Sequence, residues 1–278
     1  MSDARMIEVR VNEQARRVPA GTSLHEVRGT HKPDADILIL NGFPVAADTT
    51  LAHGDEVILI RRGEIPAPEE LESLLVARHG PRVHEKLKHG HVGIAGCGGL
   101  GSTLAVALAR SGVGRLTLVD FDLVEPSNLN RQQFFVDQIG QPKVEALATN
   151  LKRINPYVSV DCHQYRITKA DVARLFGSCS VVAECFDDPA AKAELSAAMR
   201  RTLPALSLVA VSGIAGYGPA SAIRCRRVFG NHFLVGDLVT KAEPGRGLLA
   251  PRVTVAAGMQ ANVVLRILLG EIATEEGE

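Results

Sequence analysis

The sequence predicts an α/β protein whose larger part is a doubly wound, mostly parallel sheet, preceded by a small α+β unit. From residue 91 onward, short apolar runs alternate with segments of helical periodicity, which is typical of parallel strands joined by right-handed crossovers. A glycine-rich turn follows the first apolar run, in GHVGIAGCGGLGS over residues 90–102. The first 62 residues instead follow the order strand, strand, helix, strand, strand, which indicates a small mixed sheet with one covering helix.

The first unit carries local signals for each of its elements. Apolar alternation on both sides of the turn-prone pair Asn12-Glu13 predicts a hairpin. Thr22 or Ser23 can cap a helix that has Glu26 in its first turn. The expected strands cover residues 6–11, 14–18, 36–45 with a break at Asn41-Gly42, and 54–62.

A change of composition at Pro66 and Pro68 marks the end of this unit, because proline breaks a strand. We therefore expect three parts: a domain over 1–62, a linker with a helical lead-in over 63–89, and a second domain over 90–278. In the second domain the expected strands cover 91–96, 115–120, 158–163, 180–186, 204–211 and 220–228, and the expected helices cover 100–110, 143–154, 169–176 and 252–269.

Composition excludes several function classes. Lys plus Arg and Asp plus Glu both number 31, so no overall charge draws the chain to nucleic acid or to an anionic membrane, and we expect neither as a partner. The N-terminus lacks the apolar core of a signal peptide, and no membrane-spanning run is expected, which favours a cytoplasmic location. None of the five cysteines forms a CxxC pair, so the sequence predicts no zinc site.

The glycine turn is the first candidate for chemistry. Gly96, Gly98 and Gly101 match G-x-G-x-x-G between a strand and a helix, the Rossmann-like context in which a helix N-terminus binds a nucleotide phosphate. Asp120 ends the next strand, about 20 residues further on, where a carboxylate can accept hydrogen bonds from a ribose. These features alone also fit an NAD-dependent dehydrogenase.

A cluster of polar residues after Asp120 favours a triphosphate. Charge that develops on a leaving pyrophosphate needs cationic side chains, and Arg131 and Lys143 can supply them, with Asn128 and Gln132 nearby in sequence. Asp187 follows an apolar strand and is the candidate carboxylate for magnesium, whereas Asp188-Pro189 fits a helix cap.

Together these motifs resemble the ThiF/MoeB superfamily of adenylating enzymes. The resemblance rests on GxGGLGS, DxDxVxxSNLxRQ, GQPKVE, RINP and the Asp after the fourth strand, and it covers about residues 75–270. The stretches SGIAGYG and GDLVTKAEPGRGLLAPRV look similar to the ThiF-like branch assigned to thiamine biosynthesis.

The resemblance implies that the C-terminal carboxylate of a ThiS-like sulfur carrier attacks the α-phosphate of ATP, releasing pyrophosphate. A sulfur donor protein can then convert the adenylate to a thiocarboxylate. Asp120 would bind the ribose, Asp187 would bind magnesium, and Gln132 would support the phosphate-binding set. By motif position, the other residues that would hold and activate ATP are Gly96, Gly98, Gly99, Gly101, Asn128, Arg131 and Lys143.

Further expectations follow from the resemblance. Family members are homodimers in which an upstream arginine reaches the partner's ATP, and Arg78, rather than Arg82, is the preferred candidate here. Many relatives bind structural zinc through two CxxC pairs that this sequence lacks. Some use a reactive cysteine; Cys185 and Cys225 are the candidates, and a structural role is favoured for both.

The first 62 residues resemble ThiS, a ubiquitin-like β-grasp carrier. A working carrier ends in Gly-Gly with a free carboxylate, whereas this sequence reads Arg62-Gly63-Glu64 and continues. We expect this unit to serve as a scaffold, dimer element or regulator rather than as substrate.

Three alternatives stay open at this stage. The substrate is a MoaD-type or other ubiquitin-like carrier in the first, the chain is an NAD-dependent oxidoreductase in the second, and it is a non-catalytic regulatory homologue in the third. The dehydrogenase leaves Asn128, Arg131, Lys143 and Asp187 unexplained.

Overall fold

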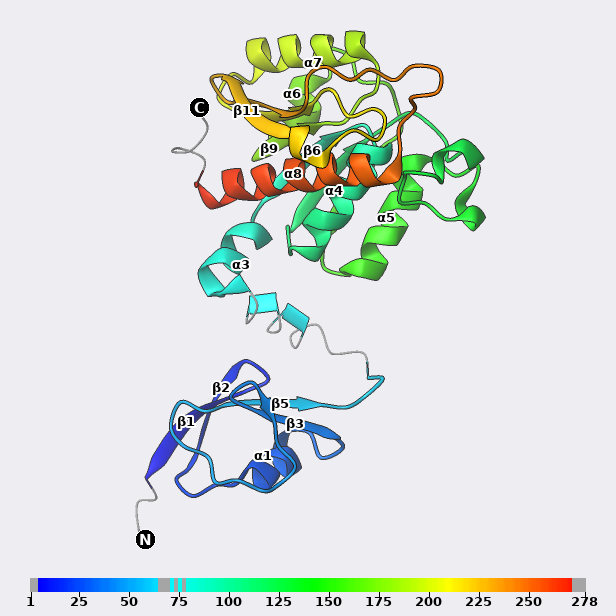
Figure 1. Cartoon of the computed structure of the whole chain (residues 1–278). Helices are drawn as coiled ribbons and strands as arrows, with labels where there is room; N and C mark the ends of the chain where they lie inside the picture. Colours follow the sequence, from blue (N-terminus) through cyan, green and yellow to red (C-terminus); the bar gives the residue numbers. More distant parts are fainter. Residues whose placement is uncertain (1–4, 65–70, 73–74, 77–78, 272–278) are drawn as a thin grey trace. The chain divides into compact units, whose positions relative to one another are not determined.

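The computed structural model describes residues 5–64, 71–72, 75–76 and 79–271. The chain divides into two compact units, Met1–His84 and Glu85–Glu278, and each is considered by itself (Figure 1). Helix α3 (Pro81–Lys88) spans the division.

The first unit is a five-stranded mixed sheet covered by one helix. The strand order is β2-β1-β5-β3-β4, with β1 and β5 parallel and the other neighbours antiparallel. Asn12 and Glu13 have positive φ angles of 44° and 67°, which suit a tight hairpin between β1 and β2. The elements are β1 (Met6–Val11), β2 (Gln14–Pro19), α1 (Leu24–His31), β3 (Ile37–Leu40), β4 (Phe43–Pro44) and β5 (Glu56–Ile60).

The predicted hairpin and helix of this unit are confirmed. Ser23 is the N-cap of α1: its hydroxyl accepts from the Glu26 N–H, and the Glu26 carboxylate accepts from the Ser23 N–H. Strand β1 buries every second residue, and Leu24 and Val27 of α1 pack on that buried face to form the core of the unit.

The second unit has the predicted doubly wound sheet. Its seven strands follow the order β11-β12-β10-β9-β6-β7-β8, and all neighbours are parallel except β11 against β12. Helices α6 and α7 cover one face, and α4, α5 and α8 cover the other (Figure 1). The strands are β6 (His91–Ala95), β7 (Arg115–Val119), β8 (Ser159–His163), β9 (Val181–Glu184), β10 (Ser207–Val211), β11 (Arg224–Phe229) and β12 (His232–Gly236).

The helices of this unit agree with the sequence pattern in most places. Helix α6 is shorter than expected, because residues 169–171 stay outside it. Short 3-10 turns follow β7 and β10. The helices are α4 (Gly99–Arg110), α5 (Lys143–Ile154), α6 (Val172–Phe176), α7 (Pro189–Thr202) and α8 (Ala250–Leu269), and the turns are η1 (Pro126–Asn128), η2 (Val136–Gln138) and η3 (Ala220–Ala222).

Strand β12 was not expected from the sequence. It inserts between β10 and β11, pairing in parallel with the former and antiparallel with the latter. The two-residue turn Gly230-Asn231 between β11 and HFLVG is a hairpin signal in the sequence, and it was missed.

Helix α8 is long and apolar enough to span a membrane by length and composition, contrary to the expectation that no such run exists. Val253, Ala256, Ala257, Val263 and Val264 are all buried in the cluster that joins α8 to α4 and the sheet. In this fold α8 is therefore a core helix.

Candidate functional site

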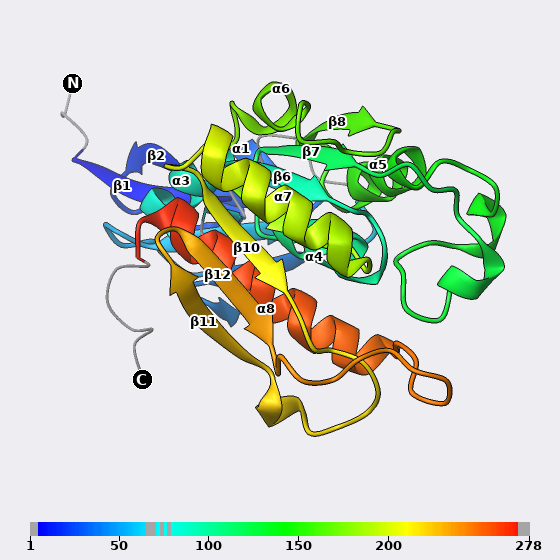
Figure 2. The same cartoon turned by 90° about the horizontal axis from the view of Figure 1, so that it is seen from above.

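The carboxyl ends of β6 and β9 define the candidate site. From β6 the chain moves to β7 on one side, whereas from β9 it moves to β10 on the other, so the strand order reverses between these neighbours. Open α/β sheets bind ligands at such a reversal. Figure 2 shows the long connections between β7 and α5 and between β12 and α8 extending from this same edge.

The glycine turn joins β6 to α4 at this edge. Gly96 has a φ of +94°, a backbone conformation that side chains rarely adopt. A methyl group at Gly101 would lie 1.9 Å from the carbonyl oxygen of Gly96, so this position accepts only glycine. Gly98 is the N-cap of α4 and offers no side chain to the helix N-terminus, which leaves the first N–H groups available to an anion.

Asp120 lies directly after β7 and is buried. Its Oδ2 accepts from the Cys97 N–H in the glycine turn at 2.6 Å, and its Oδ1 accepts from the Asp122 N–H at 2.9 Å. Burial is the largest cause of a raised pKa for this carboxyl, and the two N–H donors act in the opposite direction. Asp120 therefore fixes the turn as well as lying where a ribose is expected.

Lys143 is the first residue of α5 and is buried. Its Nζ donates to Oδ2 of Asp122 at 2.7 Å. Lys143 is thus joined through Asp122 to Asp120 and the glycine turn.

Arg131 and Gln132 lie against the start of α4. A methyl group at Gly99 would lie 3.3 Å from Cγ of Arg131, and one at Gly98 would lie 3.7 Å from Nε2 of Gln132. The Arg131 guanidinium donates to two neutral acceptors, the Ser127 carbonyl at 3.2 Å and Asn130 Oδ1 at 2.8 Å.

The Oε1 atom of Gln132 is buried and has no hydrogen-bond partner. A buried acceptor without a donor costs free energy unless a ligand or water supplies one. An acceptor without a donor, next to the free N–H groups at the start of α4, is consistent with a bound nucleotide that supplies the missing donor.

Asn128 is buried in η1 and has a local role. Its Oδ1 accepts from the Glu125 N–H at 3.1 Å, and its Nδ2 lies 3.4 Å from Oγ of Ser127. The long second contact leaves the amide nitrogen free to donate to a stronger acceptor.

Asp187 is exposed and lies three residues after Glu184, the last residue of β9. Its neighbour Phe186 lies against the glycine turn, since a methyl group at Gly96 would lie 3.2 Å from the Phe186 ring. Asp188 caps α7 by accepting from the N–H groups of Ala190 and Ala191, as expected. Over the described ranges no cluster of three His, Cys, Asp or Glu side chains forms a metal centre, so magnesium here would depend on phosphate oxygens for further ligands.

The remaining candidates are placed as follows. Arg78 lies outside the described residues, and Arg82 is exposed on α3. Cys185 is buried beside Gln260, and burial raises its pKa well above the ordinary range, which disfavours the thiolate. Cys225 lies half-buried in β11.

Two features of the site were missed by sequence reasoning. Asp122 links Asp120 to Lys143, and the second aspartate of the motif DFD was its only signal. At the start of α8, buried Arg252 bonds to Asp237 at 2.5 Å and to the carbonyls of Gly218 and Pro219. Val253, the next residue, packs on the glycine turn, where a methyl at Gly99 would lie 3.1 Å from its Cγ1.

Comparison with protein families assigns both parts of the chain. Residues 71–277 match the ThiF family, and residues 7–63 match the ThiS-like ubiquitin family. The molybdopterin-synthase adenylyltransferase of Escherichia coli (strain K12) is 34% identical in an alignment of 197 residues that covers 67% of this chain and 76% of that protein. Ubiquitin-like modifier-activating enzyme 5 of Drosophila ananassae is 46% identical over 88 residues, which are 32% of this chain and 22% of that protein.

Solved structures share the fold. The E. coli tRNA N6-threonylcarbamoyladenosine dehydratase TcdA, in complex with ATP, matches with a TM-score of 0.66 at 23% identity, covering 76% of this chain and 99% of that one. E. coli MccB with ATP matches with a TM-score of 0.56 at 24% identity, covering 78% of this chain and 67% of that one. The chain belongs to the ThiF family of adenylyltransferases and carries a ThiS-like ubiquitin domain ahead of its ThiF domain.

Proposed function

We propose that this enzyme uses ATP to adenylate the C-terminal glycine carboxylate of a ThiS-like sulfur carrier, for the thiazole half of thiamine. The carboxylate oxygen attacks the α-phosphorus, the bond between that phosphorus and the bridging oxygen to the β-phosphate breaks, and pyrophosphate leaves. The observation that carries the proposal is the joining of the glycine turn, Asp120, Asp122 and Lys143 by hydrogen bonds at the reversal of strand order.

Each site residue has a proposed role that its surroundings support. Asp120 accepts from the ribose, and the glycine turn over 96–101 lets the phosphates approach the backbone. Arg131 and Lys143 neutralise the charge that develops on the leaving pyrophosphate, and Asn128 donates its amide to a phosphate oxygen. Gln132 offers its orphaned Oε1 to a hydroxyl or a bound water, and Asp187 takes one magnesium position.

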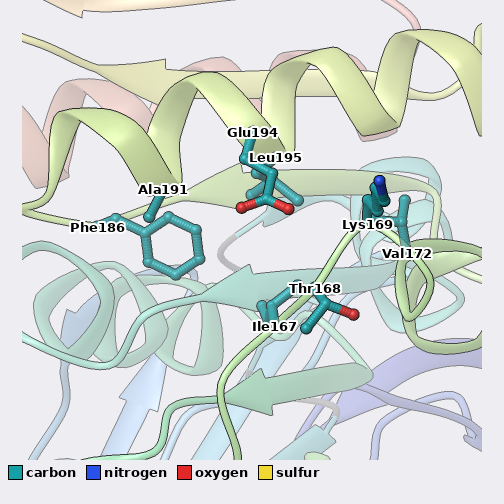
Figure 3. Close-up of a pocket in the computed structure, with 8 residues that line it drawn as sticks. All are labelled: Ile167, Thr168, Lys169, Val172, Phe186, Ala191, Glu194 and Leu195. Atoms are coloured by element: carbon teal, nitrogen blue, oxygen red, sulfur yellow. The ribbon is translucent and has the colours of Figure 1, made fainter.

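A small pocket with room for about one water lies beside the glycine turn, since the Phe186 ring that lines it also faces Gly96. It lies between the segment after β8 and the start of α7, and the Phe186 ring, Ile167 and Leu195 give it apolar walls. Figure 3 shows the Glu194 carboxylate on the side of α7 that faces Ile167 and Thr168. The pocket is too small for a purine base, so no part of ATP is assigned to it.

The fused unit is proposed not to be the substrate. Its C-terminal segment is held to its own domain: Arg61 pairs with Asp34 at 2.6 Å, and Glu64 pairs with Lys32 at 2.8 Å. The Arg62 N–H donates to Asp36 at 3.1 Å. A carrier tail must extend freely to reach ATP, so a separate protein with a free Gly-Gly end is the proposed substrate.

Two carrier proteins are candidates for the substrate. A MoaD-type carrier is the alternative, because the matched E. coli relative is by name a molybdopterin-synthase adenylyltransferase. The ThiS-like match of the fused domain favours a thiamine carrier for this chain. A homodimer with Arg78 reaching the partner's ATP, a sulfur donor protein, a cytoplasmic location and the absence of structural zinc all stay predictions.

The test is ATP–pyrophosphate exchange in the presence of magnesium. It is run with ThiS, with MoaD and without a carrier, and each carrier ends in a free Gly-Gly. We expect exchange that requires ThiS and is lost in Arg131→Ala, while Arg153→Ala, which removes an exposed arginine on α5, keeps it. Exchange with MoaD alone would establish the alternative. ATP binding without exchange with any carrier would favour the regulatory homologue, and no ATP binding would contradict the proposal.

A further inference from the structure

A continuous chain of hydrogen bonds runs from the glycine turn to Lys143. The Cys97 N–H donates to Asp120 at 2.6 Å, the Asp122 N–H donates to the other oxygen of Asp120 at 2.9 Å, and the Asp122 carboxylate accepts from Lys143 Nζ at 2.7 Å. The proposed ribose ligand and the proposed phosphate ligand are therefore the two ends of one network, with Asp122 between them.

Asp122 is held by its backbone at both sides. Its N–H is bound to Asp120, and its carbonyl oxygen accepts from the Lys143 backbone N–H at 3.0 Å. A bridge between Leu123 and Pro142 joins the same two segments. Because the main chain is fixed, the carboxylate is fixed next to the start of α5 rather than free to move with a loop.

The ammonium of Lys143 has N–H donors left for a second partner. Only 7% of its side chain is exposed, whereas 45% of the Asp122 side chain is. A buried ammonium needs a counter-charge, and Asp122 supplies the one ion pair described for it. An ammonium has three N–H donors, so the bond to Asp122 leaves two for phosphate oxygens.

We propose that Asp122 is a positioning residue whose carboxylate holds the Lys143 ammonium at the place where the triphosphate binds. This inference rests on the proposed function, because it takes ATP as the ligand. It assigns to Asp122 no contact with the reacting atoms.

The opposite role is the competing hypothesis. A carboxylate beside a triphosphate repels it, so Asp122 would oppose ATP binding if the lysine had to leave it first. The two roles predict opposite signs for the removal of the charge. Asp122→Asn removes the charge and keeps the size, and Asp122→Glu keeps the charge but displaces it by one methylene.

The experiment measures the binding of ATP and of adenosine, separately, to the full chain by calorimetry. For Asp122→Asn we expect the Kd of ATP to rise by about tenfold, the size of one charge-assisted hydrogen bond, with the Kd of adenosine within about twofold of wild type. The Kd of ATP for Asp122→Glu should lie between the values for wild type and Asp122→Asn. Asp137→Asn is the matched control, since Asp137 is an exposed aspartate in the same connection and should leave both affinities unchanged.

The contrast between the two ligands separates positioning from general damage. A folding defect would weaken ATP and adenosine alike, and thermal unfolding without ligand measures such a defect directly. An unchanged or lower Kd of ATP in Asp122→Asn, or an equal loss of adenosine binding, would overturn the proposal. If wild type binds ATP but exchanges no pyrophosphate, the proposed reaction fails while this binding test still decides the role of Asp122.

Discussion

Gly101 faces the carbonyl oxygen of Gly96 at a distance that leaves no space for a side chain. For Gly101→Ala we expect a shifted glycine turn, the loss of measurable ATP binding and a destabilisation of about 1–3 kcal/mol, typical of overpacking. Calorimetric titration with ATP and urea unfolding measure the two effects.

The control for this change is Gly258→Ala on α8. A methyl group there meets nothing within 4 Å, and alanine favours a helix over glycine by about 0.5–1 kcal/mol. This variant should bind ATP normally and be no less stable. Normal ATP binding by Gly101→Ala would show that the turn can rearrange at little cost.

His91 makes the stability of the folded chain depend on pH. Its Nδ1 contacts the Ser178 carbonyl at 3.0 Å and its Nε2 contacts the Thr117 hydroxyl at 2.8 Å, and burial is the main cause that lowers its pKa below 6.5. Below pH 6.5 the unfolded chain gains a proton that the folded chain does not, so stability falls as the pH falls through this window. Thermal unfolding between about pH 7.5 and 5.5 should show this decline.

His91→Gln should reduce that decline without abolishing it, because burial also lowers the pKa of His232. The comparison is the slope of Tm against pH, not the Tm itself. An identical slope in the variant would mean that other groups account for the whole dependence.

At the scale of elements, the buried pair of Arg252 and Asp237 joins the start of α8 to the segments after β10 and β12. Arg252→Met would leave Asp237, whose side chain is only 11% exposed, without its cationic partner, although the Val239 and Thr240 N–H groups would still donate to it. We expect a loss of about 3–5 kcal/mol in the free energy of unfolding, measured in urea.

The matched control is Arg115→Met, which breaks the pair with Asp161 on the exposed edge of the sheet. Because water reaches both side chains, that change should cost much less stability than Arg252→Met. Equal effects of the two substitutions would show that Arg252 contributes no more than a surface ion pair.

Some helices and strands could be predicted from sequence patterns alone, and others could not. The spacing of apolar residues predicted α5 with its observed bounds of Lys143–Ile154. The cap signal placed the start of α1 after Thr22 or Ser23, and Ser23 is the N-cap in the structure. The pattern failed for β12, which is five residues long and acquires its place from pairing with β10 and β11. A short strand inside a sheet is stabilised by its neighbours, and one of these, β10, ends 21 residues before β12 begins.

At the scale of the whole molecule, each unit has its own buried core. Leu24→Ala removes a fully buried side chain from the core of the first unit and should destabilise that unit by about 2–5 kcal/mol. We expect one calorimetric transition to move to lower temperature while the affinity for ATP stays unchanged.

Leu104→Ala, in the core of the second unit, is the reciprocal change and should move the other transition. If Leu24→Ala lowered the affinity for ATP as much as Leu104→Ala does, that result would contradict independent folding of the two cores.

The sequence by itself determined the fold class, the glycine turn and the order of the candidate residues along the chain, because these depend on local periodicity and on motifs within one strand, turn or helix. Only the tertiary structure decided which of those residues meet. The Asp122 carboxylate and the Lys143 ammonium lie 21 residues apart in sequence, and Val253 reaches the glycine turn from α8. Such contacts depend on how distant segments pack, and no local pattern records that packing.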